Sequence, residues 1–300
     1  MTQIISALSD ISTRYKAMFV DLWGCVHNGV VPFPEAVAAL QAYRRAGGIV
    51  VLVTNSPRPR ASVATQLAQI GVPVDAYDTI ATSGDSARAA MFQGVVGRKV
   101  YHIGLPDEGG FFEPLALLDE PVQIERVSLD EAEGIVCTGP FDSLADPAIN
   151  RPAFLAAKTK GLKLLCANPD IIVDRGEVRE WCAGALAQLY TEMGGESLYF
   201  GKPHPPIYDL ARRRLAQIDD VADSEILAIG DGIGTDVSGA LGEDLDVLFI
   251  SGGLAARETG TGTTGGPEAS KLAAYLTDHQ SEPRYTIGML RLSAPNSHRN

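Results

Sequence analysis

The sequence is poor in cysteine and has no segment typical of an exported or membrane protein. Its four cysteines form no CxxC pair, so we expect reduced thiols rather than a disulfide framework. The first residues, MTQIISALSDISTRYK, lack the cationic start and the long apolar core of a secretory signal. Because no uninterrupted apolar run reaches membrane-spanning length, we expect a soluble, cytoplasmic protein with no membrane partner.

The chain also has a deficit of positive charge. Acidic residues outnumber basic residues by 37 to 25, which gives a net charge of -12. Such a surface repels phosphate backbones, so we expect no nucleic-acid partner. A small anionic substrate is compatible with this charge if a local cationic or metal site binds it. The sequence leaves both a monomer and an oligomer open.

Short apolar strand patterns alternate with amphipathic helix patterns along the first third of the chain. Strands are predicted over 17–20, 49–54 and 78–82, and helices over 34–46 and 60–70. This order predicts a parallel sheet with crossover helices. A hydrophobic content of 45% is ample for the core of such a fold.

Further strand patterns divide the chain into two domains. A second series of strand patterns covers 99–104, 133–139 and 163–170. Strand patterns like those of the first third of the chain return at 196–203, 225–232 and 246–253. A Gly/Thr-rich stretch over 255–270 is predicted to be a flexible loop. We therefore predict a core made of residues 1–84 and 197–300, interrupted by a smaller α/β domain over 85–196.

Polar residues follow the apolar strands of the predicted core. They are Asp21, Thr54, Lys202 and Asp231. The carboxyl ends of parallel strands converge on one crevice, so we expect these side chains to share a site. Asp236 follows shortly after Asp231, and clustered carboxylates suit Mg²⁺, which prefers hard oxygen ligands. Lys202 would add a compact positive charge for a phosphate or for the nucleophile.

The stretches DLWG, VLVTNS, GKPHP and GDGIGTD resemble, in this order, the four motifs of the haloacid-dehalogenase-like (HAD) hydrolase superfamily. The TNS form, the long insert before the lysine, and ANPD followed by AGAL resemble its class IIA. That class includes nitrophenyl-phosphatase-like, nucleotide and sugar phosphatases. The resemblance covers residues 16–250 and implies a Rossmann-like parallel-sheet core with an inserted α/β cap of the C2 type.

The resemblance also implies roles for individual residues. Asp21 would attack phosphorus and form an aspartyl-phosphate, with Lys202 as the catalytic cation. Mg²⁺ would be bound by Asp21, Asp231 and the backbone carbonyl of Trp23, with Asp236 supporting the metal shell or Lys202. The candidate substrate- and phosphate-binding residues are Thr54, Asn55, Ser56, Arg58, Arg60, Asn168 and Asp170.

Several of these residues also have a purely structural interpretation. Asn55 and Asp236 could cap helices. The ANPD residues Asn168 and Asp170 could form an Asx-type turn without touching a ligand. The two arginines of the PRPR stretch could be solvated surface charges.

Trp23 stands where phosphatases of this superfamily carry a second aspartate, which acts as general acid and then as base. An indole cannot do this at neutral pH, because its N–H only donates a hydrogen bond. General acid–base help is typically worth about 10²–10⁴-fold, and its loss matters least for good leaving groups. His27, with an unperturbed pKa of about 6.5, is predicted to be the substitute catalytic acid. The alternative is that His27 packs or faces solvent.

Three functions are compatible with these features. The favoured one is a Mg²⁺-dependent phosphatase that hydrolyses a small phosphorylated metabolite through an aspartyl-phosphate on Asp21. A HAD hydrolase that cleaves another bond, such as carbon–phosphorus, is an alternative because such branches also lack the second aspartate. A non-catalytic module that binds a phosphorylated ligand is the third. The retained strand-end groups favour an enzyme, whereas the missing acid favours the module.

Overall fold

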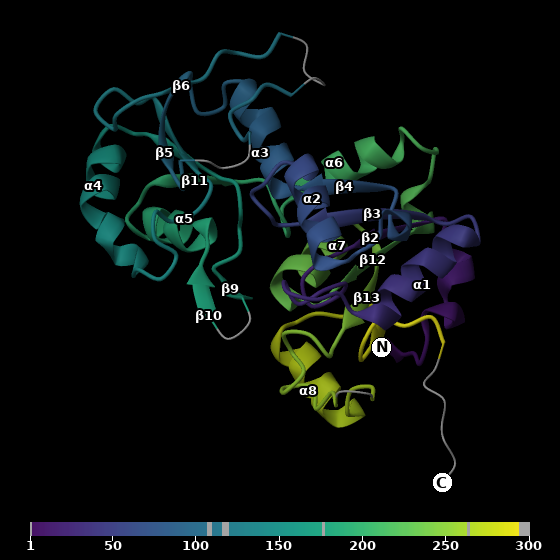
Figure 1. Cartoon of the computed structure of the whole chain (residues 1–300). Helices are drawn as coiled ribbons and strands as arrows, with labels where there is room; N and C mark the ends of the chain where they lie inside the picture. Colours follow the sequence, from purple (N-terminus) through teal and green to yellow (C-terminus); the bar gives the residue numbers. More distant parts are fainter. Residues whose placement is uncertain (1, 107–109, 116–119, 176–177, 263–264, 294–300) are drawn as a thin grey trace. The chain divides into compact units, whose positions relative to one another are not determined.

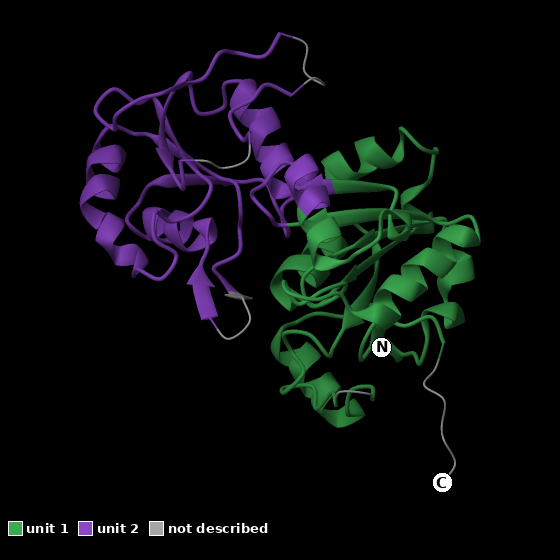
Figure 2. Cartoon of the chain, viewed as in Figure 1, with its two compact units in different colours: residues 1–54, 66–80, 208–300 green, residues 55–65, 81–207 purple. Residues whose placement is uncertain are grey.

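The computed structural model describes residues 2–106, 110–115, 120–175, 178–262 and 265–293. Its internal contacts divide the chain into two compact units, shown in two colours in Figure 2. Unit 1 comprises Met1–Thr54, Gln66–Ile80 and Tyr208–Asn300, and unit 2 comprises Asn55–Thr65 and Ala81–Ile207. Each unit contains its own sheet of parallel strands.

The sheet of unit 1 has seven strands in the order β1-β14-β13-β12-β2-β3-β4. The central strands β12, β2 and β3 pair in parallel and are almost entirely buried, as expected for a sheet covered on both faces. Strand β4, at the edge of the sheet, begins in unit 1 and ends in unit 2. The strand bounds are β1 Gln3–Ile4, β2 Ala17–Val20, β3 Ile49–Thr54, β4 Thr79–Thr82, β12 Ile226–Gly230, β13 Asp246–Ile250 and β14 Tyr285–Ile287.

The helices of unit 1 have boundaries that follow from local sequence. Helix α1, Pro34–Arg45, begins with a proline and a glutamate, carries two arginines in its last turn, and is followed by Gly47 with a φ of 95°. The other helices that belong wholly or partly to this unit are α2 Arg60–Ile70, α6 Pro205–Leu215, α7 Ser238–Gly242 and α8 Ala269–Asp278.

Unit 2 contains a five-stranded parallel sheet with helices on both faces (Figure 1). Alternate strand residues face opposite sides: Ile135 and Leu164 pack with α4 and α5, whereas Val136 and Leu165 pack with α3. The sheet order is β11-β8-β7-β5-β6, and β9 and β10 form a separate antiparallel pair. The bounds are α3 Ser83–Phe92, β5 Lys99–Ile103, β6 Glu125–Arg126, β7 Gly134–Cys137, α4 Arg151–Thr159, β8 Lys163–Cys166, β9 Ile172–Arg175, β10 Val178–Trp181, α5 Ala183–Glu192 and β11 Glu196–Tyr199.

The predicted fold class, a parallel-sheet α/β core with a second α/β unit inserted, is confirmed. One strand joins a different sheet from the one expected: β11, which was assigned to the second part of the core, pairs with β8 in unit 2. All four cysteines are free thiols, and all four are buried. Within the described residues, every helix is too short or too polar to cross a bilayer.

The stretch predicted to be a flexible loop is partly ordered. The buried hydroxyl of Thr259 donates to the backbone oxygens of Ser251 and Ala255 at 3.2 and 2.8 Å, and α8 begins at Ala269. Residues 263–264 of the predicted loop lie outside the described part of the chain.

Candidate active site

Asp21 and Asp231 leave neighbouring strands of unit 1 at nearly the same level. Strands β2 and β12 are parallel, with Val20 opposite Ile229. The backbone N–H of Asp21 continues this ladder by donating to the oxygen of Ile229 at 2.9 Å. Both carboxylates are buried, with exposed fractions of 8% for Asp21 and 5% for Asp231. The convergence that the sequence predicted for these two residues is therefore present.

The thiol of Cys25 lies with these two carboxylates. One potential ligand atom from each of Asp21, Cys25 and Asp231 lies within 4.8 Å of the others. Ligands at about 2.0–2.3 Å from a shared cation are at most about 4.5 Å apart, so this spacing is close to that of a metal site. The two carboxylates fit Mg²⁺ chemically, because a divalent cation offsets their mutual repulsion.

Two glycines allow the Asp231 carboxylate to lie directly against the backbone. A Cβ on Gly24 would lie 2.0 Å from Oδ2 of Asp231, and a Cβ on Gly253 would lie 2.1 Å from the same atom. Gly24 also has a φ of 73°, which disfavours other residues. The N–H of Leu254 donates to this oxygen at 3.0 Å. The carboxylate is thus fixed by close backbone contacts on two sides.

Asp236 lies in a π-helical turn, Ile233–Val237, between β12 and α7, and contacts the backbone just before it. Its Oδ2 accepts a hydrogen bond from the N–H of Gly232 at 3.0 Å, and a Cβ on Gly230 would lie 2.2 Å from its own Cβ. In the described part of the chain, the group of three potential metal ligands does not include Asp236. The hydrogen bond from Gly232 fixes one oxygen of this carboxylate, and the role of Asp236 in supporting the metal shell or Lys202 stays a prediction.

Trp23 is packed between His27 and Gly29. The Trp23 and His27 rings meet edge to face, with centroids 5.4 Å apart, and a Cβ on Gly29 would lie 2.2 Å from Cη2 of the indole. The Nδ1 atom of His27 accepts a hydrogen bond from the N–H of Gly29 at 2.9 Å. These contacts hold the indole within the turn that follows the nucleophile candidate.

The environment of His27 does not favour the predicted role as catalytic acid. The side chain is only 1% exposed, and this burial lowers its pKa to about 4. The imidazole is therefore neutral at pH 7, and a neutral imidazole is a poor proton donor. Its Nδ1 lone pair is already used by Gly29. The observed arrangement corresponds to the alternative in which His27 packs inside the fold.

A second set of predicted residues is assembled within unit 2 by Asn55. Its Nδ2 donates to Oδ1 of Asp170 at 2.8 Å and to the backbone oxygen of Lys202 at 3.1 Å. Its Oδ1 accepts from the N–H of Lys202 at 2.7 Å. A Cβ on Gly201 would lie 2.6 Å from this oxygen, so the glycine is needed for the approach. Asn55 thus fixes the backbone that carries Lys202, which is 4% exposed.

Of the other predicted substrate-binding residues, Thr54 is buried, and the rest lie in turns or on the surface. Oδ1 of Asn168 accepts from the N–H of Asp170 at 3.0 Å, which is the predicted Asx-type turn. The hydroxyl of Ser56 accepts from the N–H of Arg58 at 3.3 Å. Arg58 and Arg60 have exposed side chains. Thr54 is buried at the end of β3 in unit 1.

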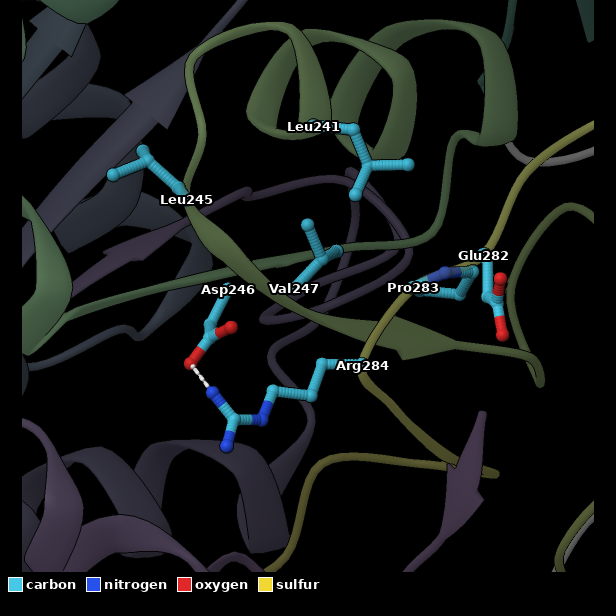
Figure 3. Close-up of a pocket in the computed structure, with 7 residues that line it drawn as sticks. All are labelled: Leu241, Leu245, Asp246, Val247, Glu282, Pro283 and Arg284. Atoms are coloured by element: carbon cyan, nitrogen blue, oxygen red, sulfur yellow. Dashed lines mark hydrogen bonds and ion pairs between the residues drawn. The ribbon is translucent and has the colours of Figure 1, made fainter. Parts of the chain in front are cut away.

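A pocket of about 300 Å³ in unit 1 contains none of the predicted site residues (Figure 3). It lies where β13 begins, whereas Asp21 and Asp231 follow the ends of their strands. Asp246 accepts hydrogen bonds there from Tyr15 at 2.6 Å and Arg284 at 2.5 Å. Burial and the nearby Asp246 raise the pKa of Tyr15, so the phenol keeps its proton. We interpret this region as structural.

Sequence reasoning did not assign two features of the site, the closeness of the Cys25 thiol to the two carboxylates and the contact of Gly253 with Asp231. The Cys25 position could have been noticed, because it lies one turn after the nucleophile candidate. The closeness of Gly253 to Asp231 depends on how the chain leaves β13, and no local pattern predicts that contact.

Comparisons with known proteins agree with this fold. The family model described as haloacid dehalogenase-like hydrolase matches residues 18–113, and a second model described as HAD-hydrolase-like matches residues 199–278. A solved hydrolase of the haloacid dehalogenase-like family from Brucella suis 1330 is 41% identical. The match covers 96% of this chain and 100% of that chain, with a TM-score of 0.82.

Two curated relatives are similar over most of their length. The 5'-nucleotidase YutF of Bacillus subtilis (strain 168) is 25% identical over 284 residues, which cover 92% of this chain and 96% of the relative. The acid sugar phosphatase of Staphylococcus saprophyticus is 23% identical over 251 residues, which cover 82% and 90%. These neighbours are of the class IIA kind that the motifs predicted. The chain therefore belongs to the haloacid dehalogenase-like hydrolase family.

Proposed function

We propose that this hydrolase is a Mg²⁺-dependent phosphatase that releases phosphate from a small phosphorylated metabolite. The observation that carries the proposal is the meeting of the Asp21 and Asp231 carboxylates, within 4.8 Å, after two parallel strands. The names of the two curated relatives, a nucleotidase and a sugar phosphatase, support the same class of reaction.

In the proposed first step, a carboxylate oxygen of Asp21 attacks the phosphorus atom. The bond between phosphorus and the leaving-group oxygen breaks, and that oxygen keeps the electron pair. Thr54 and Lys202 would bind the phosphoryl oxygens, as the family resemblance implies, and the buried position of each suits a preorganised contact. Asp21, Asp231 and the Trp23 carbonyl would hold Mg²⁺, which supplies charge neutralisation when bound.

In the second step, water attacks the phosphorus of the aspartyl-phosphate. The bond between phosphorus and the Asp21 oxygen breaks, the carboxylate is restored, and the proton of the attacking water passes to solvent. Neither Trp23 nor the neutral His27 is suited to accept this proton or to protonate the leaving group. We therefore expect substrates whose leaving group is a weak base. Aryl phosphates, acyl phosphates and phosphoanhydrides are such substrates, because they release a phenolate, a carboxylate or a phosphate.

The remaining predicted contacts belong to the same proposal. Arg58 and Arg60 would offer exposed guanidinium groups to an anionic substrate. Asn55 would act by fixing the backbone of Lys202, to which it is hydrogen-bonded twice. The carboxylate of Asp170, which accepts from Asn55, would complete this support.

A panel of phosphorylated metabolites and nitrophenyl phosphate, assayed with Mg²⁺ or with EDTA, tests the proposal. We expect phosphate release that disappears with EDTA and in the Asp21→Asn variant. Tight binding of phosphate esters without release would instead support a non-catalytic module. Release of phosphate from a phosphonate would support cleavage of a carbon–phosphorus bond.

A further inference from the structure

Cys25 places a sulfur atom among carboxylates that otherwise suit a hard cation. We propose that Asp21, Cys25 and Asp231 form a binding site for a thiophilic divalent cation, with Zn²⁺ as the representative ion. The inference rests on the proposed function in one respect, namely that Asp21 and Asp231 are metal ligands. It goes beyond that function by assigning Cys25 and a second class of metal to the site.

The backbone brings Cys25 back toward Asp21 through a compact turn. The N–H groups of Val26 and His27 donate to the oxygen of Leu22 at 2.8 and 3.1 Å, and the N–H of Gly24 donates to the oxygen of His27 at 3.0 Å. Cys25 lies inside this turn and is 1% exposed. Its Sγ lies within 4.8 Å of a carboxylate oxygen of each aspartate. Main-chain hydrogen bonds therefore fix the backbone that carries Cys25.

The spacing of the three atoms suits a tetrahedral ion. Zinc binds cysteine sulfur at about 2.3 Å and carboxylate oxygen at about 2.0–2.2 Å, which places such ligands roughly 3.3–3.7 Å apart. The three atoms lie within 4.8 Å of one another, a range that includes this separation. A fourth position would remain for water. On binding, the sulfur lone pair forms the bond to the metal, and the thiol proton passes to solvent.

The donor set distinguishes Zn²⁺ from Mg²⁺ chemically. Thiolate ligands select zinc and related soft metals, whereas carboxylate and carbonyl oxygens suit Mg²⁺. The two aspartates alone would therefore favour Mg²⁺, and the addition of Cys25 raises the affinity for a thiophilic ion. Such an ion would compete with Mg²⁺ for Asp21 and Asp231.

The other three cysteines serve as internal comparisons. They are Cys137, Cys166 and Cys182, all in unit 2 and all buried. Among the described residues, none of them belongs to the group of three potential metal ligands. Cys182→Ser is thus a matched control that removes a buried thiol elsewhere.

Co²⁺ is the probe for this site, because a cobalt–thiolate bond gives a charge-transfer absorption that carboxylate ligands do not give. The full chain is freed of metal and titrated with Co²⁺ as wild type, Cys25→Ser, Cys25→Val and Cys182→Ser. We expect the absorption in wild type and in Cys182→Ser, and its loss in both Cys25 variants. Zn²⁺ should displace Co²⁺, and its affinity should fall about tenfold or more in Cys25→Ser.

The titrations separate this inference from the proposed function. Stabilisation by Mg²⁺ that persists in the Cys25 variants, together with loss of the absorption, supports the inference. Stabilisation by Mg²⁺ without any cobalt–thiolate absorption in wild type overturns the Cys25 assignment and leaves the Mg²⁺ site standing. Binding of neither metal overturns both. If the Cys25 variants do not fold, the absorption is measured in a chain whose other three cysteines are serine, and its absence there overturns the inference.

Discussion

The carboxylate of Asp231 lies directly against the backbone at Gly253. A Cβ at that glycine would be 2.1 Å from Oδ2 and 2.5 Å from Cβ of Asp231, and the next N–H, from Leu254, donates to Oδ2 at 3.0 Å. Gly253 and Leu254, which follow β13, therefore fix the orientation of the Asp231 carboxylate, which follows β12. The direction of Asp231 toward Asp21 depends on a residue far away in the sequence.

The first prediction concerns this contact. Gly253→Ala should force the Asp231 carboxylate away from its position, because a Cβ cannot occupy that space. We expect a loss of about 1–3 kcal/mol in the free energy of unfolding, measured by urea denaturation, and a weaker stabilisation by Mg²⁺. Gly242→Ala is the matched control, since a Cβ on Gly242 would meet no atom within 4 Å. An unchanged Mg²⁺ response in Gly253→Ala would contradict this account of Asp231.

The second prediction concerns the metal itself. Mg²⁺ should raise the melting temperature of the wild-type chain, because it binds carboxylates that repel one another without it. At about 100 times its dissociation constant, a ligand stabilises the fold by about 2.7 kcal/mol. Asp231→Asn should abolish the effect, whereas Asp278→Asn, at an exposed position on α8, should retain it. A wild-type melting temperature that ignores Mg²⁺ would refute the metal site.

The third prediction concerns the pH dependence that burial of His27 imposes on stability. The unfolded imidazole takes up a proton as the pH falls through 6.5, whereas the folded one does so only near its pKa of about 4. The unfolded state therefore binds more protons between these values, so stability falls as the pH drops from 6.5 to 4. The loss should approach about 3 kcal/mol and then level off.

Urea denaturation at several pH values compares wild type with His27→Gln. The variant should lose less stability than wild type between pH 6.5 and 4, because it lacks the titrating group. The exposed His279, substituted in the same way, is the control. Parallel stability curves for wild type and His27→Gln would show that the imidazole is not buried as described.

The fourth prediction concerns the leaving group. Without an acid at position 23, the chain should prefer nitrophenyl phosphate over an alkyl phosphate more strongly than a phosphatase that keeps this acid. The ratio of the two turnover rates should be larger by about 10²–10⁴-fold. Trp23→Asp should narrow this gap by restoring a carboxylate, whereas Trp23→Phe should leave it unchanged. Equal turnover of both substrates by wild type would mean that another group supplies the proton.

The positions of Asp21 and Asp231 could be predicted because each follows a short apolar run that forms a buried strand. Parallel strands place such residues at one edge of a sheet, and the register of Val20 with Ile229 does so here. The Asx-type turn at Asn168 was equally local. These features follow from chain geometry over a few residues, which a sequence pattern records.

The features that the sequence did not reveal depend on distant contacts. The run in β11 reads as a core strand, but its pairing with β8 decides which sheet it joins. Strand β1 has two residues and β14 has three, too few for a pattern. The burial of His27 against Trp23 depends on the packing of a tight turn, which does not show in the order of residues.

Hydrolysis of nitrophenyl phosphate by Asp21→Asn in Mg²⁺ tests the central claim most directly. The amide is no longer an anionic nucleophile, so turnover should fall on the order of 10⁴-fold or more, while the melting temperature measured without Mg²⁺ stays close to that of wild type. Asp278→Asn, assayed in parallel, should remain fully active. Mg²⁺-dependent phosphate release that survives in folded Asp21→Asn would contradict the assignment of Asp21 as nucleophile.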